Sequence, residues 1–297
     1  MPRERNEAPL DLGGVTIDRV VDLENTPFSL FDIYPDATPE DVPLLARRLD
    51  PRTFDAARGD LLLSFHALLL RVGGRTILVD TCCGNDKSRP ARPAWDGRDG
   101  PFIANLAAAG VRPEDVDFVL CTHLHADHVG WNTRLLDGRW VPTFPNAQYL
   151  FAEAEYRHWK AMHDRAGPGA PILYGAFADS VLPVVERGQA VMVGPTHSPV
   201  AGVELEPVPG HTPGNVVVRV EGSRGRAVCC GDVLHHPAQF VFPDWSTRFC
   251  TDPARSRASR RRFIEQAADG PDFVLPAHFQ APWSGRVVRD GVHYRFV

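Results

Sequence analysis

The chain has 297 residues, of which 43% are hydrophobic and 23% charged, a balance typical of a globular protein with a substantial core. Its net charge of −5 offers no basic field to a phosphate backbone, so we expect no nucleic acid partner. No apolar run reaches the roughly 18 residues of a membrane span, and the first residues lack the apolar segment of a secretion signal. We therefore expect no membrane contact.

The six cysteines do not have the spacing of a small-domain disulfide framework, which predicts reduced thiols and a cytoplasmic location. The one dense basic run, RSRASRRR at 255–262, is predicted to be the solvated face of a helix.

The first part of the chain alternates between strand and helix patterns. In chain order, the expected elements are a strand over 15–23, a helix over 39–49, strands over 61–72 and 75–81 joined by a Gly73-Gly74 turn, a helix over 102–109 and a strand over 117–121. The last strand leads directly into the sequence CTHLHADHVG.

The second part is richer in strand patterns. The expected elements are a strand over 147–152, a helix over 153–162, strands over 203–208, 215–222 and 226–233, a helix over 256–268, a strand over 272–279 and a hairpin over 285–297. The Gly/Pro-rich stretch 167–171 is interpreted as a surface loop and not as a linker between domains. The reason is that candidate ligand motifs lie on both sides of it and must come together in one site. Strand-rich blocks that each finish with helices favour two sheets packed face to face with helices outside.

The stretch CTHLHADHVG combines three histidines and an aspartate within six positions. In an extended chain, residues two apart point the same way, so His123 and His125 can reach a common atom. Asp127 and His128 follow after the chain has begun to turn and can face a second position. Imidazole nitrogens and carboxylate oxygens are ligands that Zn²⁺ accepts. Chance placement of three histidines in the pattern H-x-H-x-x-H has an expectation on the order of 0.02.

A pair of metal ions needs ligands from elsewhere in the chain. His211 lies in the turn sequence PGHTPG, and Asp232, His278 and Asp80 each lie at the end of a predicted strand. Loops gather at strand ends, which is where sites are built. These four residues are therefore the further candidates.

The sequence resembles the metallo-β-lactamase-fold hydrolases. The matching motifs are LVDTCCG at 78–84, THLHADH at 122–128, GHTPG at 210–214, GD at 231–232 and AH at 277–278. The resemblance implies an α+β protein, a four-layer αβ/βα sandwich that forms a single domain over 1–297. Residues 1–60 are expected to be an N-terminal extension that packs on or near the cleft.

The resemblance also implies a ligand set for two divalent metal ions per chain, with Zn²⁺ expected and Mn, Co or Fe as alternatives. The implied ligands are His123, His125 and His211 for the first ion, Asp127, His128 and His278 for the second, and Asp232 as the bridge. Asp80 would orient ligands without binding metal.

Within the family, the likeness is greatest to the N-acyl-homoserine lactonases and methyl parathion hydrolase. This likeness rests on three stretches of the sequence, HALLLRVGGRTILVDTCCGN, HVGWN and GDVLHHPAQF. Asp232 argues against an antibiotic-hydrolysing role, because true metallo-β-lactamases generally lack the bridging aspartate. Lactonases of the best-known type have a tyrosine three residues after that aspartate, whereas this chain has His235, as in the parathion hydrolase pattern. The resemblance further suggests a homodimer.

The resulting hypothesis is a quorum-quenching lactonase or other esterase, with phosphotriesters as further substrates, that acts by attack of a metal-bridging hydroxide. Asp127 would also pass a proton, and His235 would contact the oxyanion or protonate the leaving group, although a packing role is equally compatible with its position. The alternatives are a persulfide dioxygenase and a glyoxalase-type thioester hydrolase. The small-molecule substrate is expected in an apolar pocket formed by His66, Trp131, Phe240, Phe242, Trp245 and Phe279, with Phe249 and Trp283 from the same aromatic-rich stretches.

Overall fold

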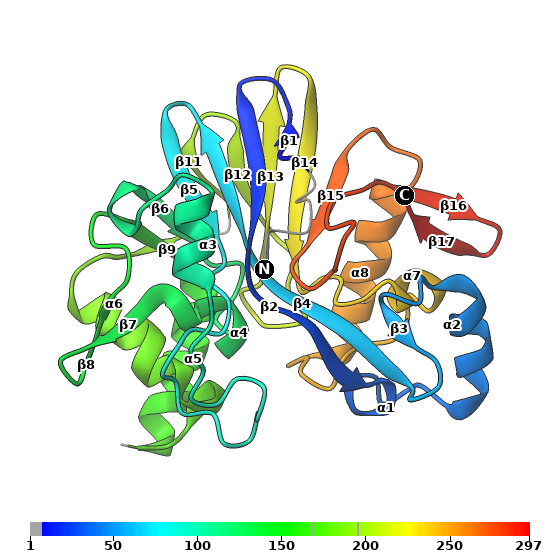
Figure 1. The fold of residues 1–297 in the computed structure, drawn as a ribbon, viewed down its shortest axis with the longest axis horizontal. Helices are drawn as coiled ribbons and strands as arrows, with labels where there is room; N and C mark the ends of the chain where they lie inside the picture. The colour runs from blue at the N-terminus through cyan, green and yellow to red at the C-terminus, as the bar shows by residue number, and fades with distance from the viewer. Residues whose placement is uncertain (1–7, 168, 195) are drawn as a thin grey trace.

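The structure, a computed structural model, describes residues 8–167, 169–194 and 196–297. Two large sheets form the centre of the molecule (Figure 1). The first sheet has the strand order β1-β2-β4-β5-β6-β9-β10, with β3 paired to β4. Its strands are β1 (Leu10–Asp11), β2 (Val15–Ser29), β3 (Phe54–Asp55), β4 (Asp60–Val72), β5 (Arg75–Val79), β6 (Phe118–Leu120), β9 (Gln148–Ala152) and β10 (Ala190–Val193).

The second sheet has the strand order β11-β12-β13-β14-β15. Its strands are β11 (His197–Val200), β12 (Val203–Pro207), β13 (Val216–Gly222), β14 (Gly225–Gly231) and β15 (Phe273–Pro276). Neighbours are antiparallel except β14 and β15, which run parallel. Two small hairpins complete the strands: β7 (Thr133–Leu136) with β8 (Arg139–Pro142), and β16 (Val287–Asp290) with β17 (His293–Phe296).

Helices cover the outer faces of both sheets. They are α1 (Leu30–Ile33), α2 (Val42–Arg48), α3 (Phe102–Ala108), α4 (Ala126–Val129), α5 (Glu153–Ala166), α6 (Leu182–Glu186), α7 (Ala238–Val241) and α8 (Pro253–Ala267), with short 3₁₀ turns and one π-helical turn, Phe177–Val181, between them. In Figure 1, α3 and α5 lie on one side of the strands and α8 on the other. The expected four-layer sandwich with mixed α and β content is confirmed.

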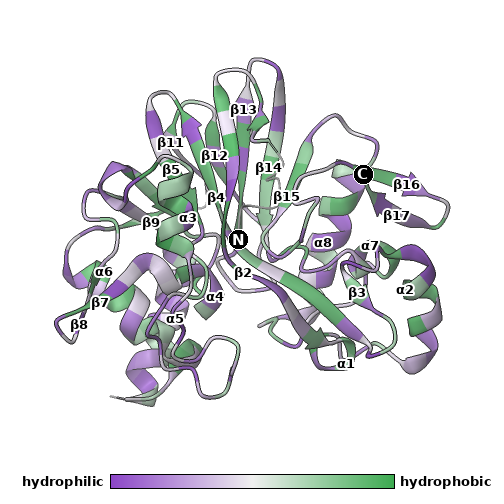
Figure 2. Cartoon of the chain, in the orientation of Figure 1, coloured by the Kyte–Doolittle hydropathy of each residue, from purple (hydrophilic) through white to green (hydrophobic). Residues whose placement is uncertain are grey.

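Strand β4 explains why the layers pack in this way. Leu68, Leu70 and Val72 belong to the core between the two sheets, whereas Phe65 and Leu69 belong to the core under the helices of the first sheet. Because side chains alternate along a strand, a continuous apolar run places one set on each face, as a strand covered on both sides requires. Figure 2 shows this run as a hydrophobic band through the middle of the molecule.

Each expected strand and helix is present, with shifted bounds. The predicted strand 15–23 continues to Ser29 through two irregularities in its pairing with β4. Strands β1 to β3 belong to the first sheet, and Phe28 and Ile33 of this N-terminal segment line the cavity described below. Position 168 of the 167–171 stretch lies outside the described residues, as do the first seven residues.

The basic run at 255–262 departs from its predicted solvated face at three buried positions, Ser256, Ser259 and Arg260. The side chain of Arg260, on the inner face of α8, is fully buried. Its Nε donates to the carbonyl of Pro243 (2.8 Å), and its Nη2 donates to Ser246 Oγ (3.0 Å). Its guanidinium is tolerated because it is hydrogen-bonded on several sides. Among the described helices, none is both long and apolar enough to cross a membrane.

A buried charge cluster holds the long loop between β5 and α3 against the rest of the first layer. Arg89 donates to both carboxylate oxygens of Asp179, at 2.7 and 2.8 Å. Lys87 Nζ lies 3.6 Å from Asp179 Oδ1, donates to Thr133 Oγ1 (2.7 Å) and sits 3.5 Å from the centre of the Trp140 ring. Both cationic side chains are almost completely buried. Burial lowers the pKa of Lys87 to about 7 although Asp179 lies beside it. The carboxylate of Asp179 is therefore the counter-charge of Arg89 and of Lys87 when this lysine is protonated.

Replacing this carboxylate by an amide, Asp179→Asn, is expected to lower the free energy of unfolding by about 3–5 kcal/mol, because it leaves buried cations without a counter-charge. Urea denaturation measures the loss. Asp115→Asn is the matched control, since Asp115 pairs with Arg112 on the surface and that pair is open to water. Equal midpoints for the two variants would contradict the assignment.

Candidate metal centre

The ligand candidates lie where strands of both sheets end. Asp80 follows β5, and the 123–128 stretch follows β6. Asp232 follows β14, and His278 follows β15. Strands β5 and β6 are parallel neighbours, as are β14 and β15, so their carboxyl ends share one edge of the sandwich.

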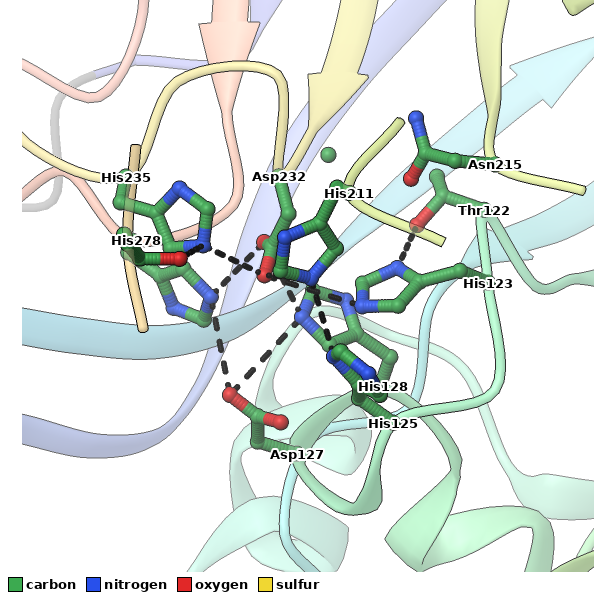
Figure 3. A network of polar contacts seen from close by, with 12 residues as sticks. Thr122, His123, His125, Asp127, His128, His211, Asn215, Asp232, His235 and His278 are labelled. Atoms are coloured by element: carbon green, nitrogen blue, oxygen red, sulfur yellow. Dashed lines mark hydrogen bonds and ion pairs between the residues drawn. The ribbon is translucent and has the colours of Figure 1, made fainter. Parts of the chain in front are cut away.

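The first cluster contains His123, His125, His211 and Asp232, whose ligand atoms lie within 4.8 Å of one another. Asp232 Oδ2 lies 3.1 Å from His211 Nε2 and 3.6 Å from His123 Nε2. His211 Nε2 and His125 Nδ1 face each other at 2.9 Å. The predicted first set of ligands is therefore brought together, as Figure 3 shows.

The second cluster contains Asp127, His128 and His278, again within 4.8 Å. Asp127 Oδ2 lies 3.6 Å from His278 Nε2 and 3.8 Å from His128 Nε2. The other carboxylate oxygen of Asp232, Oδ1, lies 3.0 Å from His278 Nε2 and 3.1 Å from His128 Nε2. One oxygen of Asp232 thus faces each cluster, which is the geometry of a bridging ligand.

Several polar atoms in these clusters make no hydrogen bond. They are His123 Nε2, His128 Nε2 and Asp232 Oδ1, and all three are buried. A buried polar atom without a partner costs free energy, and a cation accepting its lone pair removes that cost. The five imidazole nitrogens and two carboxylates of the clusters are the donor set that divalent ions such as Zn²⁺ accept. The residues therefore fit a pair of metal ions.

The opposite ring nitrogens of the histidines are held by other groups. The contacts are His128 Nδ1 with Asp80 Oδ2 (2.8 Å), His278 Nδ1 with the Ser64 carbonyl (3.1 Å), His123 Nδ1 with Thr122 Oγ1 (3.1 Å) and His211 Nδ1 with Cys250 Sγ (3.5 Å). Such contacts fix the ring orientation and leave the other nitrogen for a metal. Asp80 also accepts from the Thr122 amide (2.8 Å) and lies outside both clusters, as the resemblance implied.

The electrostatics of the site depend on Asp232. Burial raises the pKa of Asp232, but the surrounding histidines, His235 and His128 first, outweigh burial and hold it well below the usual range. Burial lowers the pKa of His123 and His125 well below the ordinary value. For His128, burial also lowers the pKa, but Asp232 and Asp80 outweigh it and raise it well above normal. For His211 in the first cluster, burial again lowers the pKa, but Asp232 outweighs burial and raises the pKa to about 10. Asp232 therefore favours positive charge at both clusters.

Glu155, at the start of α5, is a residue that the sequence did not single out. It is buried, and its Oε1 accepts from the Leu124 amide (3.2 Å) and Trp159 Nε1 (2.6 Å). Its Oε2 accepts from the Gly214 amide (2.9 Å). Glu155 thereby joins the two loops that carry His123, His125 and His211. An acidic residue in the first turn of a helix is common, so no sequence signal marks it.

The segment 247–250 is a second element that the sequence did not assign to the ligands. Thr247 Oγ1 lies 3.5 Å from His235 Nε2, and Cys250 Sγ lies 3.5 Å from both His211 Nδ1 and Thr247 Oγ1. Burial raises the pKa of Cys250, but its contact with His211 outweighs burial and lowers the pKa to about 7. Cys250 is thus the cysteine closest to the site by contact, although five others lie nearer to its motifs in sequence.

A cavity of about 350 Å³ opens over the clusters. Its floor includes His125, Asp127, Asp232, His235 and His278. Its walls are mostly apolar and consist of Phe28, Ile33, Leu63, Phe65, Trp95, Ala126, Pro171, Leu173, Tyr174 and Phe249, together with the guanidinium-bearing Arg248. A small molecule with an apolar body fits this combination of polar floor and apolar wall.

Most of the residues predicted for the pocket lie outside the cavity lining. His66 is buried and contacts Ser64 Oγ, on the face of β4 that carries Leu68 between the sheets. Trp131 stacks on Phe102 in the core of the first layer. Phe240 and Phe279 pack in the core under α8, with Trp283 buried between the sheets, and Phe242 stacks on Trp245 beside the N-terminal helices. Of the aromatic residues named from the sequence, Phe249 lines the cavity.

Comparisons with known proteins agree with this geometry. The profile of the Metallo-beta-lactamase superfamily matches residues 66–278. The chain is 30% identical over 223 residues to metallo-beta-lactamase domain-containing protein 1 of Xenopus laevis, covering 74% of this chain and 73% of that protein. It is 31% identical to the human protein of the same name over 68% of this chain and 57% of that protein, so the match spans under two thirds of the human relative.

Solved structures share the whole fold. The hydrolase AbOPH of the beta lactamase superfamily has a TM-score of 0.80 and 22% identity, covering 97% of this chain and 96% of that chain. AidC, a dizinc quorum-quenching lactonase, has a TM-score of 0.76 and 20% identity, with the same coverage. The chain belongs to the metallo-beta-lactamase superfamily, and it is an enzyme of the hydrolase kind.

The contact between Asp80 and His128 gives a first test of the centre. Asp80→Asn is expected to weaken Zn²⁺ binding by about 10- to 100-fold, because the ring of His128 loses its charged partner. Competition with a chromophoric chelator measures the affinity. Asp117→Asn is the matched control: Asp117 accepts from the Thr76 amide at the opposite end of β5. Unchanged affinity in Asp80→Asn would refute the orienting role.

Proposed function

We propose that this hydrolase cleaves the ester bond of a lactone or another carboxylic ester, using two divalent metal ions. The observation that carries the proposal is the position of Asp232. Its two oxygens face two separate ligand clusters, and both clusters open into one apolar-walled cavity. A structural zinc site closes around four ligands, whereas seven ligands beside a cavity leave positions open for a substrate.

The first ion would be held by His123, His125 and His211, the second by Asp127, His128 and His278, with Asp232 shared. Zn²⁺ is the ion we expect, because nitrogen-rich sets with carboxylates suit it. When bound, such a pair lowers the pKa of water and polarises a carbonyl oxygen. The proteins AidC and AbOPH support this only through their shared fold, because both are under 25% identical to this chain.

Asp127 and His235 are the groups that we propose for proton movement. Asp127 lines the cavity and is partly exposed, so its carboxylate can take a proton from water or pass one to a leaving oxygen. His235 Nε2 lies 3.0 Å from Asp232 Oδ2, and its Nδ1 has no hydrogen-bond partner. Burial lowers the pKa of His235 to about 4, so the ring is neutral at pH 7. Its one proton lies on Nε2, which faces the Asp232 carboxylate, and from there it can be shared with a substrate oxygen beside Asp232.

One observation favours a second candidate. Asp127, His128 and His278 form a set of two histidines and one carboxylate, which also suits a single non-haem iron. A persulfide dioxygenase would use such an ion with O₂, and a glyoxalase-type enzyme would cleave a thioester at the full site. The cytoplasmic location and the homodimer stay predictions from the sequence.

Metal analysis combined with a substrate panel tests the proposal. We expect about two Zn²⁺ per chain and hydrolysis of an N-acyl-homoserine lactone or an aryl ester, which is lost on chelation and restored by Zn²⁺. The panel also contains a phosphotriester and a glutathione thioester. One iron per chain with oxygen uptake would overturn the hydrolase proposal, and thioester cleavage alone would favour the glyoxalase type.

Two adjacent histidines provide a test of His235. His235→Gln is expected to lower kcat by about 10²-fold or more with metal content unchanged, because the proton donor beside Asp232 is lost. His236→Gln is the control, since His236 is buried but its Nε2 faces the Thr53 carbonyl (2.8 Å), away from the cavity. Steady-state kinetics measure both. If His235→Gln retained full kcat, His235 would be a packing residue.

A further inference from the structure

Among the described residues that line the cavity, one charged side chain is not accounted for by the metal clusters. Its other charged lining residues, Asp127 and Asp232, belong to the clusters. Arg248 lies on the wall and stands outside both clusters. Because the two carboxylates would be neutralised by the metal ions, Arg248 would remain as a positive charge that faces a substrate.

The backbone of Arg248 is fixed from two sides. Its amide donates to the carbonyl of Ile33 (2.9 Å), next to the cavity wall formed by α1. On the other side, Thr247 contacts His235, and the Thr251 amide donates to the carbonyl of His211 (2.8 Å). The backbone that carries the guanidinium is therefore held at a defined place relative to the clusters.

The guanidinium is available for a ligand. Its side chain is 55% exposed, and the carboxylate recorded near it is Asp32, at 3.8 Å and itself 76% exposed. An ion pair so open to water contributes little, so exchange of Asp32 for a substrate anion costs little. A substrate carboxylate can accept two hydrogen bonds from the guanidinium of Arg248. Asp32, at 3.8 Å, is too far away to accept a hydrogen bond from it.

The wall between the clusters and Arg248 is apolar and aromatic. Phe249 is the next residue along the chain, and Trp95 and Tyr174 line the same cavity. A second arginine, Arg92, packs against these rings from outside the cavity, with its guanidinium carbon 4.9 Å from the Phe249 ring centre and 5.0 Å from that of Tyr174. The aromatic wall is therefore backed by positive charge, which favours an anion nearby.

We propose that Arg248 selects substrates that carry a carboxylate at the end opposite the scissile ester, with an apolar chain or ring between the two groups. The ester would lie over the metal clusters, the apolar part against Phe249, Trp95 and Tyr174, and the carboxylate at Arg248. This inference rests on the proposed ester hydrolase function and narrows its substrate class.

Two esters of equal chain length test the selection: 4-nitrophenyl hexanoate, which is neutral, and mono-4-nitrophenyl adipate, which ends in a carboxylate. For the Zn²⁺-loaded enzyme we expect a higher kcat/KM with the adipate. Arg248→Met should lower kcat/KM for the adipate about 10-fold, mainly by raising KM, and leave the hexanoate within about twofold. Arg248→Lys should keep part of the preference, and 0.5 M NaCl should reduce it in the unmodified enzyme.

Arg257→Met is the matched control, because Arg257 donates to the Asp244 carbonyl on the outer surface and does not line the cavity. It should leave both rates unchanged. Equal effects of Arg248→Met on both esters, or no effect on the adipate, would overturn the inference and leave the hydrolase proposal intact. If the Zn²⁺-loaded enzyme cleaved neither these esters nor a lactone, the proposed function would fail, and this inference with it.

Discussion

The carboxylate of Asp232 is the constraint on which the site depends. It is a buried anion contacted by histidines from four separate loops, and a charge in that position is stable only while they surround it. Its two oxygens face in opposite directions, so the ligands of the first sheet and those of the second must approach it from both sides. The strand ends of the two sheets therefore have to meet at one edge, and the sandwich is the arrangement that brings them there.

Close contact at that edge requires small residues. Gly231, just before Asp232, has a φ of +48°, and a Cβ there would lie 2.8 Å from Thr122 Oγ1. Gly214, after His211, allows the backbone to approach Glu155, where a Cβ would lie 2.3 Å from the Glu155 amide nitrogen. Any larger side chain would push apart the loops that hold the ligands. The glycines of the GD and GHTPG motifs thus set the distance between the two halves of the site.

The sequence was informative where a local pattern determines position. His123, His125, Asp127 and His128 occupy adjacent places after one strand, and the strand ends at Asp232 and His278 could be located from apolar runs. The cavity wall could not be predicted, because an aromatic residue after a strand can face either the core or the cleft, and packing between layers decides which. Phe240 and Phe279 face the core under α8, whereas Phe28 and Trp95, in segments without any motif, form the wall.

The structure separates the groups that perform chemistry from those that choose a substrate. The ligands are attached to strand ends and held by buried partners such as Asp80 and Glu155, so their geometry tolerates little change. Part of the wall comes from loops, which carry Trp95, Arg248 and Phe249, and part from strands β2 and β4, which carry Phe28, Leu63 and Phe65. The loop with Trp95 is held in place by the buried contact of Arg89 with Asp179, so its other residues can vary. Substrate preference can therefore change in this fold by loop substitution alone, because neither Arg248 nor Trp95 contributes a ligand to the clusters.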